Sequence, residues 1–72
     1  MSTPAPFDIA LAALLHHRAD DALASARAYD AMPGRLPRVM ARRCQRLALK
    51  NRYQASLLAP VAWAAAAAEV AA

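Results

Sequence analysis

Apolar residues in the first half of the chain recur at helical spacing. They are Phe7, Leu11, Leu14 and Leu15, which stand at i, i+4, i+7 and i+8. The pattern weakens at Arg18, which falls in the middle of this apolar stripe, and Asp20 would suit the N-cap of a fresh helix. Because no Gly or Pro interrupts residues 7–32, we favour one continuous helix over two helices broken near 16–20.

A second long helix is predicted after the pair Pro33-Gly34. Glycine adopts the left-handed backbone conformation that ends many helices, and proline stops the helix before it. The second helix can then run to about residue 59, because Pro60 cannot continue it. The alanine-rich segment 60–72 is expected to form either a short helix or a frayed tail, and residues 1–5 a flexible lead.

The second predicted helix has two chemically different sides. Seven of the nine basic residues lie between Arg35 and Arg52, with no acidic residue among them. Because a helix turns by roughly 100° per residue, residues spaced by four line up along one side. They are Arg38, Arg42, Arg46 and Lys50, flanked by Arg35 and Arg43, and we call these six residues the basic ridge. The opposite side carries Leu36, Met40, Cys44, Leu47, Ala48, Ala55 and Leu58.

The composition supports an all-α fold. The chain contains 22 alanines, which favour helix strongly and bury little surface. One Ile, three Val and one Phe leave little from which a sheet could be built. We therefore predict a single domain over residues 1–72, a helical hairpin followed by a C-terminal element.

The chain is short for a stable core. Seventy-two residues support only a marginal core, and the lone Cys44 excludes both an internal disulfide and a cysteine-rich zinc site. Association is the remaining means of stabilisation, so we predict a homodimer. The seam expected to hold it together consists of Phe7, Leu11, Leu14, Leu36, Met40, Leu47 and Leu58.

Catalytic and metal-binding patterns are sparse. His16 and His17 are adjacent, so they point about 100° apart and cannot hold one metal as an i, i+4 pair would. Asp20 and Asp21 each follow one of them by four residues, which favours surface pairs instead. There is no glycine-rich phosphate loop, and no serine has a base nearby in sequence. We expect no metal, no cofactor and no enzymatic activity.

The basic ridge is the main functional feature of the sequence. One interpretation is a solvated helix face, paired in part with Asp20, Asp21 and Asp30 on the facing helix. The six cations outnumber these acids, and like charges at i, i+4 repel, which indicates a use in binding. The predicted partner-binding residues are Arg35, Arg38, Arg42, Arg43, Arg46, Lys50, Arg52 and Tyr53.

Two kinds of partner fit this set. We favour an acidic surface on a larger protein, because Val39, Tyr53 and Leu57 border the cations and supply apolar contacts. The alternative is a DNA- or RNA-binding regulator whose ridge engages phosphates. A membrane partner is not expected, since the basic helix lacks Trp and Phe anchors.

The remaining features complete the functional prediction. No basic N-terminal region precedes the first apolar run, so no secretory signal is predicted and a cytoplasmic location is expected. The chain is predicted to be a small non-enzymatic regulator or inhibitor. Its size suits an accessory factor of the kind that phages or plasmids encode.

Overall fold

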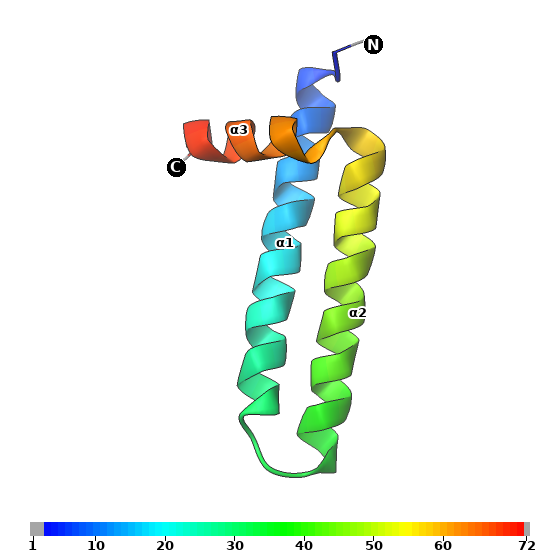
Figure 1. The fold of residues 1–72 in the computed structure, drawn as a ribbon, viewed down its shortest axis with the longest axis vertical. Coiled ribbons are helices and arrows are strands. Elements are labelled where there is room, and N and C mark those ends of the chain that lie inside the picture. Colours follow the sequence, from blue (N-terminus) through cyan, green and yellow to red (C-terminus); the bar gives the residue numbers. More distant parts are fainter. Residues whose placement is uncertain (1–2, 72) are drawn as a thin grey trace.

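The computed structural model describes the backbone of residues 3–71 and the side chains of residues 3–67. It contains three α-helices in order: α1 Pro6–Asp30, α2 Arg35–Leu58 and α3 Val61–Ala71. The two long helices are antiparallel and lie side by side as a hairpin, and α3 crosses the N-terminal part of α1 (Figure 1). Residues 3–71 contain no strand, so the predicted all-α fold is confirmed.

The first helix is continuous. It runs from Pro6 to Asp30 without the break considered near residues 16–20, because nothing in that stretch removes a backbone hydrogen bond. Pro6 stands in the first turn, where the missing N–H would have no partner in the helix. The preferred prediction of one long helix is therefore confirmed.

The turn between the long helices depends on one glycine. Gly34 has φ +110° and ψ 173°, a conformation that residues with a Cβ atom rarely adopt. It stands at the N-cap of α2, whereas α1 ends through Ala31 in ordinary right-handed conformation. The glycine thus supplies the unusual backbone expected of it, but it begins α2 and does not end α1.

Alanine makes the contact between α1 and α2. The helices meet through Ala12, Ala19 and Ala26 of α1 and Ala41, Ala48 and Ala55 of α2, which we call the alanine seam. Each row repeats every seven residues, the spacing of helices that stay in register over several turns. All six residues are at most 2% exposed. The centre of the contact is therefore formed by methyl groups, and half-buried Ile9, Leu15, Leu23 and Leu58 pack against it.

The large apolar residues predicted for the dimer seam do not form the contact between α1 and α2, apart from Leu58, which packs at its edge. No large side chain among the described residues is fully buried. Phe7 and Leu36 are 75% and 71% exposed, Leu14 and Leu47 are about half exposed, and the other three predicted seam residues are half-buried. The physical reason is that alanines occupy the line facing the neighbouring helix, so the larger side chains project beside it.

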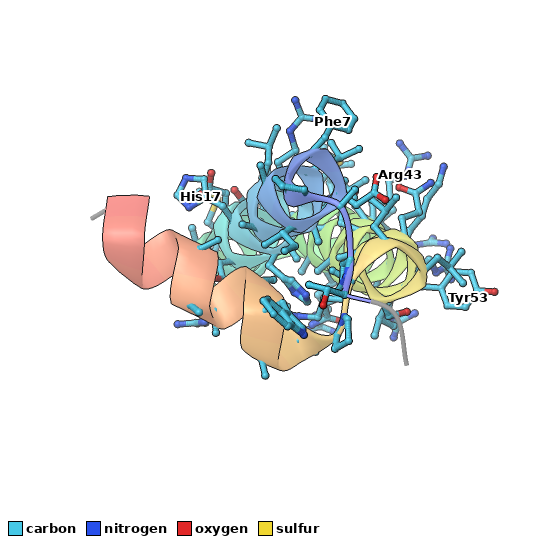
Figure 2. The ribbon with its side chains drawn as sticks, turned by 90° about the horizontal axis from the view of Figure 1, so that it is seen from above. Phe7, His17, Arg43 and Tyr53 are labelled. Atoms are coloured by element: carbon cyan, nitrogen blue, oxygen red, sulfur yellow. The ribbon has the colours of Figure 1, made fainter. Side chains whose placement is uncertain are left out.

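These larger residues share one side of the hairpin. The seven residues of the predicted seam, which we call the apolar face, are Phe7, Leu11, Leu14, Leu36, Met40, Leu47 and Leu58. Helix α3 lies on the other side, where Ala64 joins Ala12, Ala55 and Ala59 in a buried cluster. Seen along the hairpin, Phe7 projects away from α3 (Figure 2). One side of the hairpin is thus partly covered by α3, whereas the apolar face is left open except at Leu58, which packs against the same cluster.

Candidate partner-binding surface

The basic ridge lies on the side of α2 that faces away from α1. The alanines of α2 turn toward α1, so residues on the opposite arc of the helix project into solvent. All six ridge residues are exposed. Figure 2 shows Tyr53, which neighbours the ridge, projecting from α2 away from α1. The ridge residues therefore form a continuous cationic surface along α2.

No acidic group of the described residues neutralises this surface. Two ion pairs occur among them: Arg52 with Asp20 at 2.7 Å, and His17 with Asp21 at 3.5 Å. Neither pair includes a ridge residue, and both use acids that were candidates for compensating the ridge. Repulsion between ridge cations spaced by four therefore persists in the hairpin, at a few tenths of a kcal/mol per pair.

Arg52 lies apart from the ridge. It is half-buried, and its guanidinium donates one hydrogen bond to Asp20 Oδ1 at 2.7 Å and faces His16 Nδ1 at 3.1 Å. A guanidinium can only donate, so the second contact is a hydrogen bond when Nδ1 of His16 is unprotonated. Arg52 thus ties α2 to α1, and the outward-facing set is smaller than the sequence analysis assigned.

Large apolar side chains stand among the ridge cations. Leu49, Tyr53 and Leu57 are each about two-thirds exposed, and Val39 is also exposed, although less so. Val39, Tyr53 and Leu57 were predicted from the sequence to border the ridge, whereas Leu49 was not. Leu49 stands three residues after Arg46 and four before Tyr53, and residues at these spacings are neighbours on a helix surface, so the sequence could have predicted its place beside them. The outer side of α2 therefore offers charge and apolar area together.

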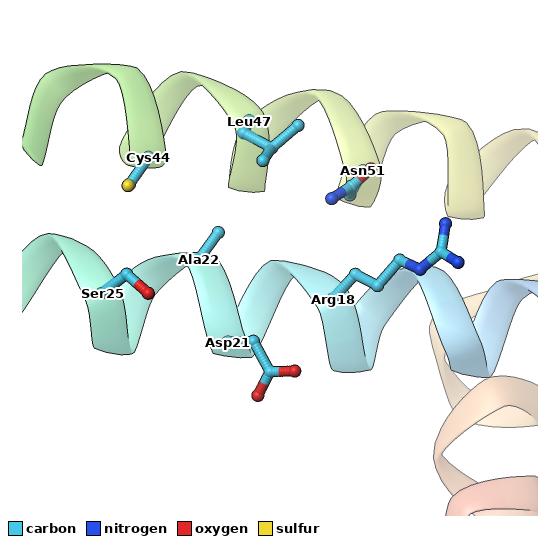
Figure 3. A pocket seen from close by; sticks show the side chains of 7 residues that line it. All are labelled: Arg18, Asp21, Ala22, Ser25, Cys44, Leu47 and Asn51. Atoms are coloured by element: carbon cyan, nitrogen blue, oxygen red, sulfur yellow. The ribbon is translucent and has the colours of Figure 1, made fainter. Parts of the chain in front are cut away.

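A shallow groove of about 400 Å³ opens between the two long helices on the side of the apolar face (Figure 3). It is lined by Arg18, Asp21, Ala22, Ser25, Cys44, Leu47 and Asn51. Asn51, which is 9% exposed, is the one buried polar residue of the described chain and points toward α1. No histidine lines the groove, so neither Ser25 nor Cys44 has a neighbouring imidazole base there.

The adjacent histidines have separate surroundings. His17 is exposed and contacts Asp21, while His16 is half-buried against Arg52 in a second pocket of about 280 Å³ near α3. The Nε2 atom of His16 is buried and has no hydrogen-bond partner. Over the part of the chain that the structure describes, no three His, Cys, Asp or Glu side chains gather as a metal site would require.

Two further findings concern membrane-spanning helices and similarity to known proteins. None of the described helices combines the length and hydropathy needed to cross a bilayer. No family model, curated protein or solved structure matches the chain. Functional conclusions therefore follow from the geometry of the helices alone.

Proposed function

We propose that this protein is a small non-enzymatic regulator or inhibitor that binds an acidic surface of a larger protein. The contact is made by the basic ridge together with the outer apolar residues of α2. The supporting observation is that Leu49, Tyr53 and Leu57 are exposed among cations that have no acidic partner within the described chain. The protein would act in the cytoplasm.

The mixture of side chains favours a protein over a nucleic acid. Interfaces between proteins are enriched in Arg and Tyr at their centres, and apolar side chains there exclude water from the charged contacts. Phosphates need only cations and hydrogen-bond donors, so exposed Leu49 and Leu57 would contribute little to binding them. Asn51, a residue type that can read bases, points toward α1 and away from the ridge.

Charge reversal on the ridge tests whether the surface binds a partner. Arg38→Glu with Arg42→Glu should abolish capture of an acidic protein from the source cell, because two attractive contacts become repulsive. Arg27→Glu is the matched control, since Arg27 is exposed on α1 and lies outside the ridge. Capture that survives the double substitution, or that Arg27→Glu abolishes equally, would refute a role for the ridge.

A second double variant separates the two classes of partner. Leu49→Ala with Tyr53→Ala should weaken binding to a protein by more than about tenfold, because interface anchors of this type carry a large share of the affinity. Binding to duplex DNA or structured RNA would be nearly unaffected by these substitutions and would fall steeply as salt rises. Tight, salt-sensitive binding of a DNA duplex that ignores Leu49 and Tyr53 would establish the nucleic-acid alternative.

A further inference from the structure

We infer that the apolar face is covered by a second copy of this chain, oriented so that α1 of each copy lies over α2 of the other. The inference concerns the side of the hairpin marked by the groove, and it shares with the partner-binding ridge only Arg43 and Lys50 at the edge between the two surfaces. It specifies the predicted homodimer by its contact face and by its arrangement of helices.

The chain has apolar area that it does not bury by itself. Every buried apolar residue that the structure describes is an alanine, which yields little hydrophobic stabilisation. The larger apolar side chains stand at the surface instead, and four of them lie on the apolar face: Phe7, Leu14, Leu36 and Leu47. A 72-residue chain without a disulfide has only a marginal core, and burying these side chains would add to its stability.

The dimensions suit a stable dimer. The two long helices, of 25 and 24 residues, are each about 36 Å long at about 1.5 Å per residue, and side by side they are about 20 Å wide. The face of the hairpin is therefore close to the roughly 800 Å² per partner that a standard interface buries. Two such faces packed together place four long helices around a new apolar core, which is the arrangement of a four-helix bundle.

The hairpin register shows which residues would meet. Ala12 lies level with Ala55, and Ala19 with Ala48, so residues of α1 and α2 whose numbers add up to about 67 share a level. A two-fold axis parallel to the helices keeps each level and exchanges α1 for α2. Phe7 and Leu11 then meet Leu58 of the second copy. Tyr29, five helical turns after Leu11 and therefore on the same side of α1, lies between the levels of Leu36 and Met40 at the other end, so apolar residues oppose one another at both ends.

Charge favours this arrangement over its rival, in which α1 lies over α1 and α2 over α2. Arg43 and Lys50 stand seven residues apart along the edge of the ridge next to the apolar face. If α2 lay over α2, these cations would approach those of the second copy and repel them. With α1 over α2, Asp21 falls at a level between Arg43 and Lys50 of the second copy and can attract both. Arg18, which lines the same groove, falls near Lys50 in this arrangement and near the second Arg18 in the rival, so it meets a cation in both.

Molar mass tests the contact face. Leu47→Glu places a charge in the groove and should convert a dimer to a monomer, as measured by sedimentation or light scattering at high micromolar concentration. Leu49→Glu is the matched control on the ridge side of the same helix and should leave the dimer mass unchanged. A wild-type monomer with full helicity, or equal masses for the two variants, would overturn the inference.

Thermal unfolding covers the case in which Leu47→Glu does not fold. The melting temperature of the wild-type chain should rise with protein concentration, because association stabilises the folded state by mass action. A melting temperature that is independent of concentration over a hundredfold range contradicts a dimer, whatever the variant does.

Cross-linking between single-cysteine chains tests the orientation. On a Cys44→Ser background, Ser25→Cys chains mixed with Arg43→Cys chains should join through a short bis-maleimide, since these residues share a level. Neither chain alone should cross-link. The rival arrangement places α1 over α1 in opposite directions, so Arg18→Cys chains alone would cross-link there, and that result would refute the proposed orientation.

The ridge variant Arg38→Glu with Arg42→Glu should still dimerise, which keeps this inference separable from the proposed function.

Discussion

The two sides of α2 differ in the size of the side chains that they carry. Toward α1 it presents Ala41, Ala48 and Ala55, all nearly fully buried. Toward solvent it presents the basic ridge with Leu49, Tyr53 and Leu57, which are about two-thirds exposed. Globular proteins usually bury their large apolar side chains and expose small and polar ones. The reversal leaves the large apolar residues at the surface, where the proposed partner and the proposed second copy would contact them.

The largest effect on the free energy of unfolding is expected when a large residue replaces an alanine on the side of α2 that faces α1. Ala48→Leu forces an isobutyl group between helices that meet through methyl groups, and overpacking of this kind costs about 3 kcal/mol or less. We expect the free energy of unfolding, measured with denaturant at fixed protein concentration, to fall by at least about 1 kcal/mol.

The next residue on the chain provides the control. Leu49→Ala removes a large side chain from the outer side and should change the free energy of unfolding by less than about 0.5 kcal/mol. The double exchange of Ala48→Leu with Leu49→Ala keeps the composition constant and should be nearly as unstable as Ala48→Leu alone. A double variant as stable as the wild type would show that the two sides are interchangeable.

The turn that brings the two rows of the alanine seam together gives the next largest effect. Gly34→Ala should destabilise the hairpin by about 1–2 kcal/mol, because φ near +110° strains any residue that has a Cβ atom. The added methyl meets nothing closer than Pro37 Cδ at 3.8 Å, so the cost comes from the backbone and not from a clash. Thermal unfolding monitored by circular dichroism measures it, and unchanged stability would refute the assigned backbone conformation.

The contrast between Arg52 and Arg46 gives a smaller effect. Arg52→Ala breaks the link from α2 to Asp20 and His16 and should lower stability by up to about 1 kcal/mol, the usual limit for a partly exposed ion pair. Arg46→Ala, on the outer side of the same helix, should have no destabilising effect. Equal losses for both variants, measured by denaturant unfolding, would show that Arg52 has no special role.

The smallest effect has the opposite sign. Arg42 stands four residues from both Arg38 and Arg46, so Arg42→Gln removes two repulsive pairs. Stability should rise by a few tenths of a kcal/mol at low ionic strength and the gain should vanish at high salt. Arg27→Gln on α1 is the control. Loss of stability in Arg42→Gln at low salt would indicate that ridge charges are compensated within the protein.

Much of the fold could be predicted from local signals in the sequence. Pro33, Gly34 and Pro60 divide the chain into three helices, and the four-residue spacing of the ridge cations placed them on one outward side. These features depend on neighbours along one helix. The residues that form the contact between the helices cannot be predicted from such neighbours, because they depend on which side of α2 faces α1.

The helix contact and the orientation of Arg52 were therefore not predicted. The seven-residue repeat of alanine in both helices is the signal for the contact, and the leucines predicted for the dimer seam lie beside it. Arg52 was predicted to bind a partner together with the ridge, yet its side chain turns toward α1 once the alanine rows fix the rotation of α2. A periodicity of small residues can therefore outweigh the position of large ones.

The spacing of the ridge also restricts how a partner can lie on it. The alanine rows repeat every seven residues, which lets α1 and α2 run nearly antiparallel. Arg38, Arg42, Arg46 and Lys50 repeat every four, and a row of that spacing is inclined by about 26° to the helix axis. A helix whose own four-residue rows interlock with them would cross α2 at an angle of about 50°. A helical partner of the ridge would therefore cross the hairpin obliquely and not lie alongside it.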